Sequence, residues 1–189
     1  MVHAVRQQFT FQEYLDLEER SQVKHEFLDG VVWAMAGGSP DHAAIAANVI
    51  GLLTVAVRDR PCRVFTSDLR VRVKGTGLGT YPDVTVVCGP LQTDPDDPSG
   101  HTIVNPSVVV EVLSKSTEQY DRGEKLGHYQ RVETLKEIVL LAHDEQRAEV
   151  WRRDGERWTL DVCRAEDPVK LPSLGCELSL SELYRDPTR

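Results

Sequence analysis

The stretches TYPDVTVVC (residues 80–88) and VVVEVL (residues 108–113) decide the fold of this chain. Both are rich in β-branched residues, which favour strands. Each also carries a carboxylate: Asp83 precedes the first apolar run and Glu111 lies inside the second. An ionised carboxylate buried among such residues is costly unless a positive group binds it. The two stretches therefore predict neighbouring strands whose acids form half of a cation site.

A helical segment is predicted directly after the second of these strands. Asp121, Lys125 and Tyr129 follow one another at intervals of four residues. This spacing places the three side chains on one helix face. The face can present a lysine at the end of the strand that carries Glu111, so two acids and a lysine are expected to converge.

These motifs, in their order along the chain, resemble those of one protein family. The chain resembles the Uma2 family of restriction-endonuclease-like proteins, also called the DUF820 group. The similar motifs are Tyr81-Pro82-Asp83, Glu111-Val112-Leu113-Ser114, Ser116-Thr117, Asp121, Lys125 and Tyr129. Pro82-Asp83 and Glu111 also resemble the wider PD-(D/E)XK nuclease superfamily. That superfamily has a lysine two residues after the acid, where this chain has Leu113. The resemblance makes Lys125, on the following helix, the best match and Lys115 the second choice.

The resemblance implies a metal-dependent nuclease site and a homodimer. Hard cations held by carboxylates can activate water and relieve charge during phosphodiester hydrolysis, and Mg²⁺ uses only one or two protein carboxylates. Asp83 and Glu111 are the expected ligands of Mg²⁺ or Mn²⁺. Lys125 is expected to act on the water or the transition state, and Glu26 matches an additional acid of the family. The supporting candidates are His42, Lys115, Asp121 and Tyr129.

Each of these residues also has a purely structural interpretation. An acid at a strand start, such as Asp83, can be a turn-former that hydrogen-bonds its own backbone. Glu111 can belong to a structural ion pair, and Lys125 can be a solvated helix residue. Asp121 and Lys125 can form a surface (i, i+4) pair of small value. It is the set, in family order, that favours a functional site.

Length and charge bound the protein class. A chain of 189 residues predicts one domain, here residues 1–189 with a core from about 9 to 184. The formal net charge of −8 opposes nucleic-acid binding unless a local basic patch or metal-neutralised acids provide it. Arg70, Arg72 and Lys74 alternate with apolar residues, which predicts a half-buried strand with a basic outer face. That face is the candidate nucleic-acid contact; a solvated strand face is the alternative.

The cysteine pattern suggests a reducing compartment. Cys62, Cys88, Cys163 and Cys176 are scattered, without a C-x-x-C pair. We therefore expect free thiols, which behave as small buried hydrophobes, and a cytoplasmic protein. No run approaches the roughly 18 apolar residues of a membrane span, so no membrane association is expected.

Two other chemistries are disfavoured by the motifs. The glycine-rich residues 75–79 are not followed by a helix start with Lys-Ser/Thr, as a phosphate-binding loop requires. No G-x-S-x-G motif is present, and Ser114 has no evident histidine and acid partner. Neither a P-loop nor a serine nucleophile is expected.

The predicted elements form an α/β or α+β domain with a central mixed sheet flanked by helices, as in restriction-endonuclease-like folds. Helices are expected at 11–20, after Ser39, from 117 to about 132, and at 178–184. Strands are expected at 24–28, 31–35, 63–66, 69–73, 84–88, 107–113, 137–142, 147–152 and 157–163, with a mobile surface loop at 89–105.

The sequence thus predicts an endonuclease that hydrolyses phosphodiester bonds of nucleic acid, with DNA the expected substrate. A catalytically silent nuclease-fold scaffold or binding module is the alternative, which the acidic composition favours. A phosphodiesterase for small nucleotides is a third.

Overall fold

The computed structural model describes residues 8–35 and 37–188. The helices are α1 (Phe11–Arg20), α2 (Pro40–Ala56), α3 (Glu118–Tyr120), the π-helical turn η1 (Asp121–Lys125), α4 (Leu126–Tyr129), the 3₁₀ turn η2 (Pro172–Leu174) and α5 (Leu180–Leu183). The strands are β1 (His25–Leu28), β2 (Val31–Ala34), β3 (Cys62–Thr66), β4 (Arg70–Val73), β5 (Leu78–Thr80), β6 (Val84–Cys88), β7 (Thr102–Ile103), β8 (Val108–Val112), β9 (Glu137–Leu141), β10 (Arg147–Asp154), β11 (Arg157–Arg164), β12 (Pro168–Leu171) and β13 (Cys176–Ser179).

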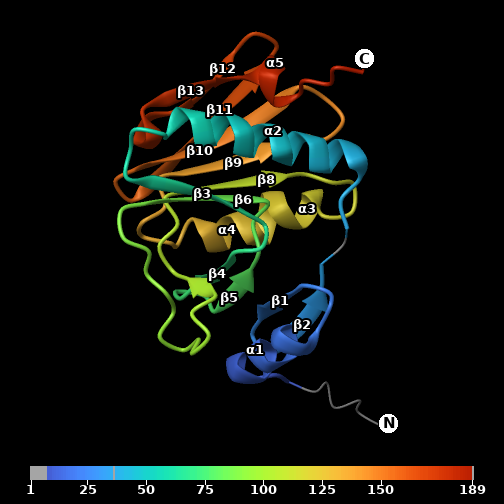
Figure 1. The fold of residues 1–189 in the computed structure, drawn as a ribbon, viewed down its shortest axis with the longest axis vertical. Coiled ribbons are helices and arrows are strands. Elements are labelled where there is room, and N and C mark those ends of the chain that lie inside the picture. Colours follow the sequence, from blue (N-terminus) through green and yellow to red (C-terminus); the bar gives the residue numbers. More distant parts are fainter. Residues whose placement is uncertain (1–7, 36, 189) are drawn as a thin grey trace.

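A six-stranded sheet in the order β11-β10-β9-β8-β6-β3 is the centre of the fold. It is mixed, because β8 and β9 run parallel while its other neighbouring pairs are antiparallel. Helix α2 covers one face, and α3 and α4 cover the other (Figure 1). The predicted α+β fold with a central mixed sheet flanked by helices is therefore confirmed.

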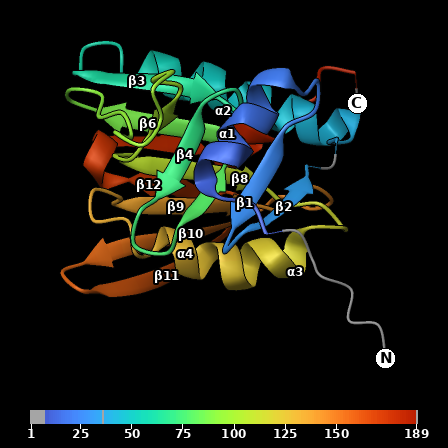
Figure 2. The same ribbon diagram turned by 90° about the horizontal axis from the view of Figure 1, so that it is seen from below.

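A second sheet was not predicted. Strands β2-β1-β5-β4-β7 form a five-stranded sheet below the α3 and α4 layer, with α1 packed against β1 (Figures 1 and 2). Strands β12 and β13 form a separate two-stranded sheet beside α2 and α5. The sequence predicted β1, β2 and β4 but assigned them to one central sheet, because pairing between distant strands leaves no local signal. It did not predict β5, β7, β12 or β13.

The alternation of side chains along β8 fixes the direction of Glu111. Val108, Val110 and Val112 pack into the core cluster beneath α2. Val109 and Leu113 pack into the cluster that contains α4 residues on the opposite face. Because side chains of a strand point alternately to its two faces, Glu111 points to the same side as Val109. The strand pattern therefore directs this carboxylate toward the helical segment that follows β8.

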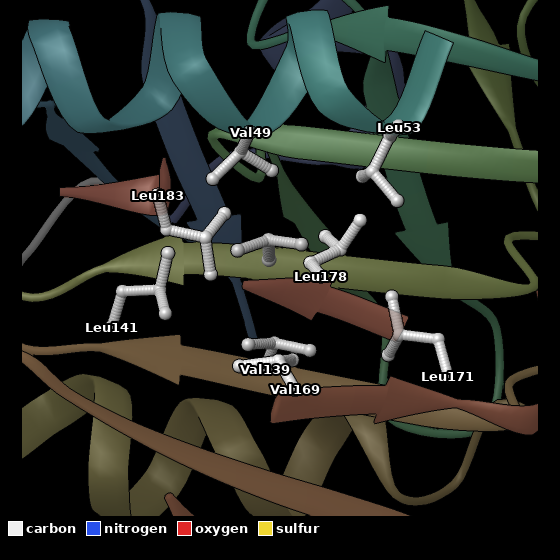
Figure 3. A pocket seen from close by; sticks show the side chains of 9 residues that line it. Val49, Leu53, Val139, Leu141, Val169, Leu171, Leu178 and Leu183 are labelled. Atoms are coloured by element: carbon white, nitrogen blue, oxygen red, sulfur yellow. The ribbon is translucent and has the colours of Figure 1, made fainter. Parts of the chain in front are cut away.

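The core beneath α2 is closely packed. Val49 and Leu53 of α2 face Val139, Leu171 and Leu178, and a residual apolar cavity of about 10 Å³ lies between them (Figure 3). A void of this size holds about one water at most, and it has no polar group to bind one. Ile45, Val49 and Leu53 form the buried stripe of α2.

Local cap and turn signals fix the starts of two helices and the first hairpin. Thr10 and Glu13 form the capping box of α1, and the Ser39 hydroxyl accepts from the His42 amide at the start of α2. Asp29 and Gly30 both have positive φ, 48° and 81°, as a type I′ hairpin turn requires. Within the described residues, no helix has the length and apolar character needed to cross a membrane.

The segment 89–105 corrects one prediction. It was expected to be a mobile surface loop, but Thr102–Ile103 forms β7 beside β4, and Thr93 bridges Ile103. Asp94 and Asp97 are buried, at 1% and 5% exposure. Buried partners on β4 fix this segment, and its proline and aspartate content did not reveal them.

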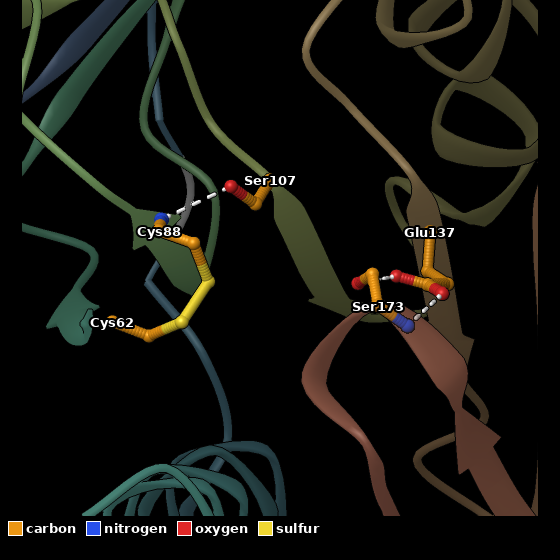
Figure 4. The surroundings of a disulfide bond; sticks show 5 residues. All are labelled: Cys62, Cys88, Ser107, Glu137 and Ser173. Carbon is orange, nitrogen blue, oxygen red and sulfur yellow. Dashed lines mark hydrogen bonds between the residues drawn. A yellow bond between two sulfur atoms is a disulfide. The ribbon is translucent and has the colours of Figure 1, made fainter. Parts of the chain in front are cut away.

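The cysteines correct a second prediction. Cys62 and Cys88 form a disulfide, while Cys163 and Cys176 are free (Figure 4). The cause is the register of β3 and β6, which sets these two residues directly opposite each other. Figure 4 also shows Ser107 accepting from the Cys88 amide, and buried Glu137 accepting from Ser173. The expectation of four free thiols was wrong for two of them.

Reduction of the disulfide is expected to destabilise the fold by about 3.5 kcal/mol. The bond closes a sequence separation of 26 residues, and the chain-entropy model gives this magnitude for such a loop. Urea unfolding with and without reductant measures it. The Cys62→Ala/Cys88→Ala variant is the control and should not respond to reductant. Four free thiols in the denatured, unreduced protein would contradict the bond.

Candidate functional site

Asp83, directly before β6, lies opposite Glu111 of β8. The register pairs Val84 with Val110, so the next residues, Asp83 and Glu111, are cross-strand neighbours. The Asp83 amide donates to Glu111 Oε2 at 3.4 Å, and the Val112 amide donates to Asp83 Oδ2 at 2.8 Å. The predicted meeting of the two acids is therefore present in the fold.

Lys125 completes the cluster from the helical side. Its Nζ lies 2.9 Å from Glu26 Oε1, 2.9 Å from Glu111 Oε1 and 3.6 Å from Asp121 Oδ1. The Lys125 side chain is only 6% exposed. Tyr129 donates its hydroxyl to Glu111 Oε1 at 2.5 Å, and the Thr80 hydroxyl donates to Glu26. The structure thus brings Glu26 of β1 to Glu111 of β8, opposite Asp83.

A π-helical turn carries Asp121 and Lys125. The Leu126 amide donates to the Asp121 carbonyl, five residues earlier, as in a π-helix. Sequence analysis predicted one regular helix from 117 to about 132, so the helix is correct in position but not in regularity. Single π turns are rare and frequent at functional sites. Here the turn buries both Asp121 and Lys125.

Burial governs the electrostatics of this cluster. Burial raises the pKa of Glu111, although the nearby Lys125 ammonium acts to lower it. Burial alone would lower the pKa of Lys125, but the surrounding acidic groups, Glu111 first, raise it well above its ordinary value. Burial also raises the pKa of Asp121. Lys125 therefore keeps its proton and supplies the positive charge that the buried acids need.

His42 reaches the cluster from the first turn of α2. Its Nε2 lies 3.1 Å from Asp83 Oδ2, and this hydrogen bond raises the pKa of His42. Gly38 makes room for the ring, because a Cβ at Gly38 would lie 2.5 Å from His42 Nδ1. The Ser39 cap fixes the start of α2, so the loop and the cap together aim His42 at Asp83.

The predicted supporting residues divide into two groups. His42, Asp121 and Tyr129 contact the acids or Lys125. Lys115 is exposed and does not line the cleft described below. Sequence reasoning missed Thr80, whose signal was a small hydroxyl residue next to the Tyr81-Pro82-Asp83 motif.

A cleft of about 780 Å³ lies beside the cluster. Asp83, with a side chain 17% exposed, connects the buried groups to it. Sequence reasoning also missed two aromatic residues of its wall, Trp33 and Tyr120. The signal for Trp33 was the two-residue Asp29-Gly30 turn, which sets it opposite Glu26 in the hairpin.

Asp83 and Glu111 offer oxygen donors of the kind that a divalent cation binds. Two opposed carboxylates suit Mg²⁺ or Mn²⁺, which take oxygen ligands and few protein carboxylates. The side-chain contacts of Asp83 within the described residues involve Oδ2, which leaves Oδ1 for a ligand. In residues 8–35 and 37–188, no three His, Cys, Asp or Glu side chains gather in a way that could hold a metal. The residues therefore fit an ion that also binds substrate oxygens or water.

The predicted basic outer face of β4 is not present. Arg70 is buried at 3% exposure; it donates to Asp97 at 3.1 Å and to the Thr102 hydroxyl at 2.6 Å. Arg72 is half-buried over the Phe11 ring, and Lys74 pairs with Asp94. Helix α1 and segment 89–105 cover the face that β-alternation alone would leave to solvent. The predicted nucleic-acid surface is therefore wrong for Arg70 and Arg72, which contact other parts of the fold, whereas Lys74 stays exposed beside Asp94.

The Asp97→Asn variant is expected to lose at least about 2 kcal/mol of stability at pH 7. Burial acts to raise the pKa of Asp97, but hydrogen bonds from Ser99 and Thr102 and the Arg70 guanidinium lower it to about 2. A carboxyl group whose pKa is lowered by folding stabilises the fold at every pH above the pKa of the unfolded state. This contribution disappears as the pH falls from about 4 to 2.

Urea unfolding at pH 7 and pH 3 tests the Asp97 contribution. The difference between Asp97→Asn and the parent protein should shrink at pH 3. Asp96→Asn, at an exposed neighbouring acid, is the control and should stay close to the parent at both values. An Asp97→Asn effect that is independent of pH would contradict the proposed charge pairing.

The family of the chain follows from comparison with known proteins. The model of the Uma2 family, described as "Putative restriction endonuclease", matches residues 11–181. The chain belongs to the Uma2 family. The resemblance based on the Pro82-Asp83, Glu111 and Lys125 motifs is therefore confirmed.

Relatives and one solved structure agree with this family. The Uma2 chain is 35% identical over 176 residues to "Uncharacterized protein slr1290" of Synechocystis sp., covering 92% of this chain and 90% of that protein. It is 34% identical over 169 residues to "Uncharacterized protein sll1609" of the same organism, covering 88% and 94%. It also resembles a solved structure described as "a putative nuclease belonging to DUF820 from Anabaena variabilis ATCC 29413", with a TM-score of 0.75, 22% identity and coverage of 93% and 97%. At that identity the likeness establishes the mixed α+β fold.

Proposed function

We propose that this Uma2 protein is a metal-dependent endonuclease that hydrolyses phosphodiester bonds of nucleic acid, with DNA the expected substrate. One observation carries the proposal. A buried lysine lies 2.9 Å from both Glu26 and Glu111, and Asp83 stands opposite Glu111 at the cleft. A buried ion pair is costly to maintain for stability alone, and groups with shifted pKa values in a cleft are typical of functional sites.

Asp83 and Glu111 are the proposed metal ligands. Bound there, Mg²⁺ or Mn²⁺ would supply Lewis-acid activation of the phosphoryl group and of a water molecule. The Val112 amide and His42 hold the Asp83 carboxylate in one orientation. Tyr129 holds Glu111 in the same way. The protein thus presents two carboxylates whose rotamers are already fixed.

Lys125 is the proposed catalytic cation. In hydrolysis, the water oxygen forms a bond to phosphorus, the bond from phosphorus to the leaving oxygen breaks, and a proton passes to that oxygen. The Lys125 ammonium can orient the water or stabilise negative charge that develops on the phosphoryl oxygens. Glu26 and Asp121 hold the ammonium in place, since both lie within ion-pair distance of Nζ.

The proposal extends to assembly and location. A homodimer is proposed from the family resemblance, because a duplex has two strands to cut. A cytoplasmic location is proposed from the composition. The Cys62–Cys88 disulfide is the observation against that location, because disulfides are rare in reducing compartments.

Metal binding and cleavage, measured on the same variants, test the proposed function. Calorimetry with Mn²⁺ should show saturable binding that Asp83→Ala/Glu111→Ala abolishes. Cleavage of labelled DNA and RNA, single-stranded and duplex, should require the cation and disappear in the same variant. Glu156→Ala, at an exposed turn, removes an acid far from the cluster and should behave like the parent protein. The absence of saturable binding at millimolar Mn²⁺ would overturn the proposal.

A catalytically silent scaffold or binding module is the second candidate. The observation that favours it is the complete ion pairing of Lys125, which has three carboxylates within 3.6 Å. This candidate predicts nucleic-acid or partner binding without cation-dependent cleavage. A phosphodiesterase for small nucleotides is separated from both by assaying mononucleotide esters beside the polymers.

A further inference from the structure

Two aromatic residues lie beside the acids in the cleft. Trp33 is paired with Glu26 in the β1–β2 hairpin, so both side chains are on the same face of the hairpin. Tyr120 directly precedes Asp121. The two rings contact each other edge to face, with centroids 6.1 Å apart and an interplanar angle of 88°. Both rings line the cleft, next to Glu26 and Lys125.

The Tyr120 hydroxyl is a buried polar group without a protein partner. Within the described residues, the oxygen has no hydrogen-bond partner. Burial raises the pKa of Tyr120, so the phenol stays protonated and remains a donor. A buried hydroxyl left unpaired costs free energy. A ligand in the cleft that offers an acceptor would remove this cost.

The charges of the cleft do not suit a duplex. In the described part of the chain, its lining contains four carboxylates, two lysines and no arginine. Lys125 is paired with three of these carboxylates, and Lys24 Nζ is 2.6 Å from Asp68. Duplex binding depends largely on cations that contact many phosphates. The walls of this cleft can instead contribute apolar contact and stacking.

Helix α2 contributes aliphatic side chains to the cleft lining. Ala43, Ala46, Ala47 and Ile50 line the cleft at helical spacing. The volume of about 780 Å³ is that of a small-ligand pocket. It can hold one or two nucleotides, whereas a stacked duplex would have to stay outside.

From these features we infer that the cleft binds an unpaired nucleotide of a single strand, with its base against the Trp33–Tyr120 pair and an acceptor on that nucleotide at the Tyr120 hydroxyl. The inference rests on the proposed function, since it names the substrate class of the same site. Stacking on aromatic side chains is the usual way in which proteins hold single strands, and it tolerates any base. The phosphate beside that base would lie near Asp83 and Glu111.

Binding measured apart from cleavage tests the inference. Fluorescence anisotropy of a labelled oligo(dT) strand, and of a duplex of the same length, is titrated in Ca²⁺ at two salt concentrations. The single strand should bind at least about tenfold more tightly. Its salt slope should be shallow, because the cleft lining has few cations to contact phosphates. Trp33→Leu keeps apolar volume without a ring and should weaken single-strand binding about tenfold or more. Trp33→Phe should keep most of the affinity.

Tyr120→Phe separates binding from folding. Removal of an unpaired buried hydroxyl should leave the melting temperature unchanged or higher, while single-strand affinity falls severalfold. Trp158→Phe, at a tryptophan that lies outside the cleft lining, is the control and should bind like the parent protein. A structural role alone for Tyr120 would leave the affinity unchanged.

The outcomes separate the inference from the proposed function. Equal or tighter duplex binding, or single-strand binding that Trp33→Leu leaves unchanged, overturns the inference even if the protein cleaves DNA. Single-strand binding that depends on Trp33, without cleavage in Mg²⁺ or Mn²⁺, supports the inference and overturns the nuclease proposal. Absence of binding to both oligonucleotides overturns the inference.

Discussion

The Lys125→Met variant is expected to lose about 3–5 kcal/mol of stability at pH 8 and all cleavage activity. Methionine fills a similar volume but removes the ammonium that neutralises the buried acids Glu26, Glu111 and Asp121. Removal of one partner of a buried ion pair leaves uncompensated charge, which has this cost. The loss should therefore come from charge and not from a cavity.

The pH dependence of the Lys125→Met effect tests this cause. Without the ammonium, the pKa of Glu111 should rise further, because burial already raises it. A carboxyl pKa raised in the folded state means that stability falls as the pH rises from the unfolded value, about 4.5, toward the folded value. The variant should therefore be least destabilised near pH 5 and most destabilised near pH 8, as measured by urea unfolding at both values.

Lys115→Met is the matched control for Lys125→Met. It removes the same charge from the exposed lysine that sequence reasoning ranked second. Its stability should stay within about 0.5 kcal/mol of the parent protein, and its activity should be unchanged. If Lys125→Met were destabilised equally at pH 5 and pH 8, lost packing would be the explanation and the charge cluster would lose its support.

The sequence predicted most elements because their signals are local. The Thr10 capping box, the Asp29-Gly30 turn and the Ser39 cap each lie within a few residues of the structure they specify. The five-stranded sheet escaped prediction, because the pairing of β1 with β5 joins strands about 50 residues apart. The Cys62–Cys88 disulfide escaped prediction for the same reason, because it follows from the pairing of β3 with β6.

The site was predictable where spacing and family order reinforced each other. The β6 and β8 runs located Asp83 and Glu111, and the helical spacing located Lys125. The prediction of a basic outer face on β4 failed, because alternation shows which residues share a face but not what covers that face. Segment 89–105 supplies Asp97 to Arg70, and no pattern in that segment reveals this contact. The π turn is also invisible in the spacing of Asp121 and Lys125.

The Glu111→Gln variant is expected to lose activity without losing stability. The amide keeps the shape of the side chain, and its oxygen can still accept the Tyr129 hydroxyl. One of the two proposed metal carboxylates is lost. Replacement of residues that merely orient metal ligands lowers metal affinity or activity about 10- to 100-fold. Loss of a ligand itself should therefore lower the cleavage rate at least about 100-fold. Cleavage rates at saturating Mg²⁺ and Mn²⁺ would measure this loss.

The stability of Glu111→Gln should move opposite to that of Lys125→Met. Glu111 is buried with a raised pKa, so its charged form is disfavoured in the fold, and a neutral amide removes that cost at pH 8. Glu26 and Asp121 remain beside Lys125 and keep its ammonium paired. Unfolding free energy at pH 8 should therefore be equal to or higher than that of the parent protein. A metal ligand is not needed for the metal-free protein to fold. A large loss of stability together with the loss of activity would therefore make Glu111 a structural ion-pair residue instead.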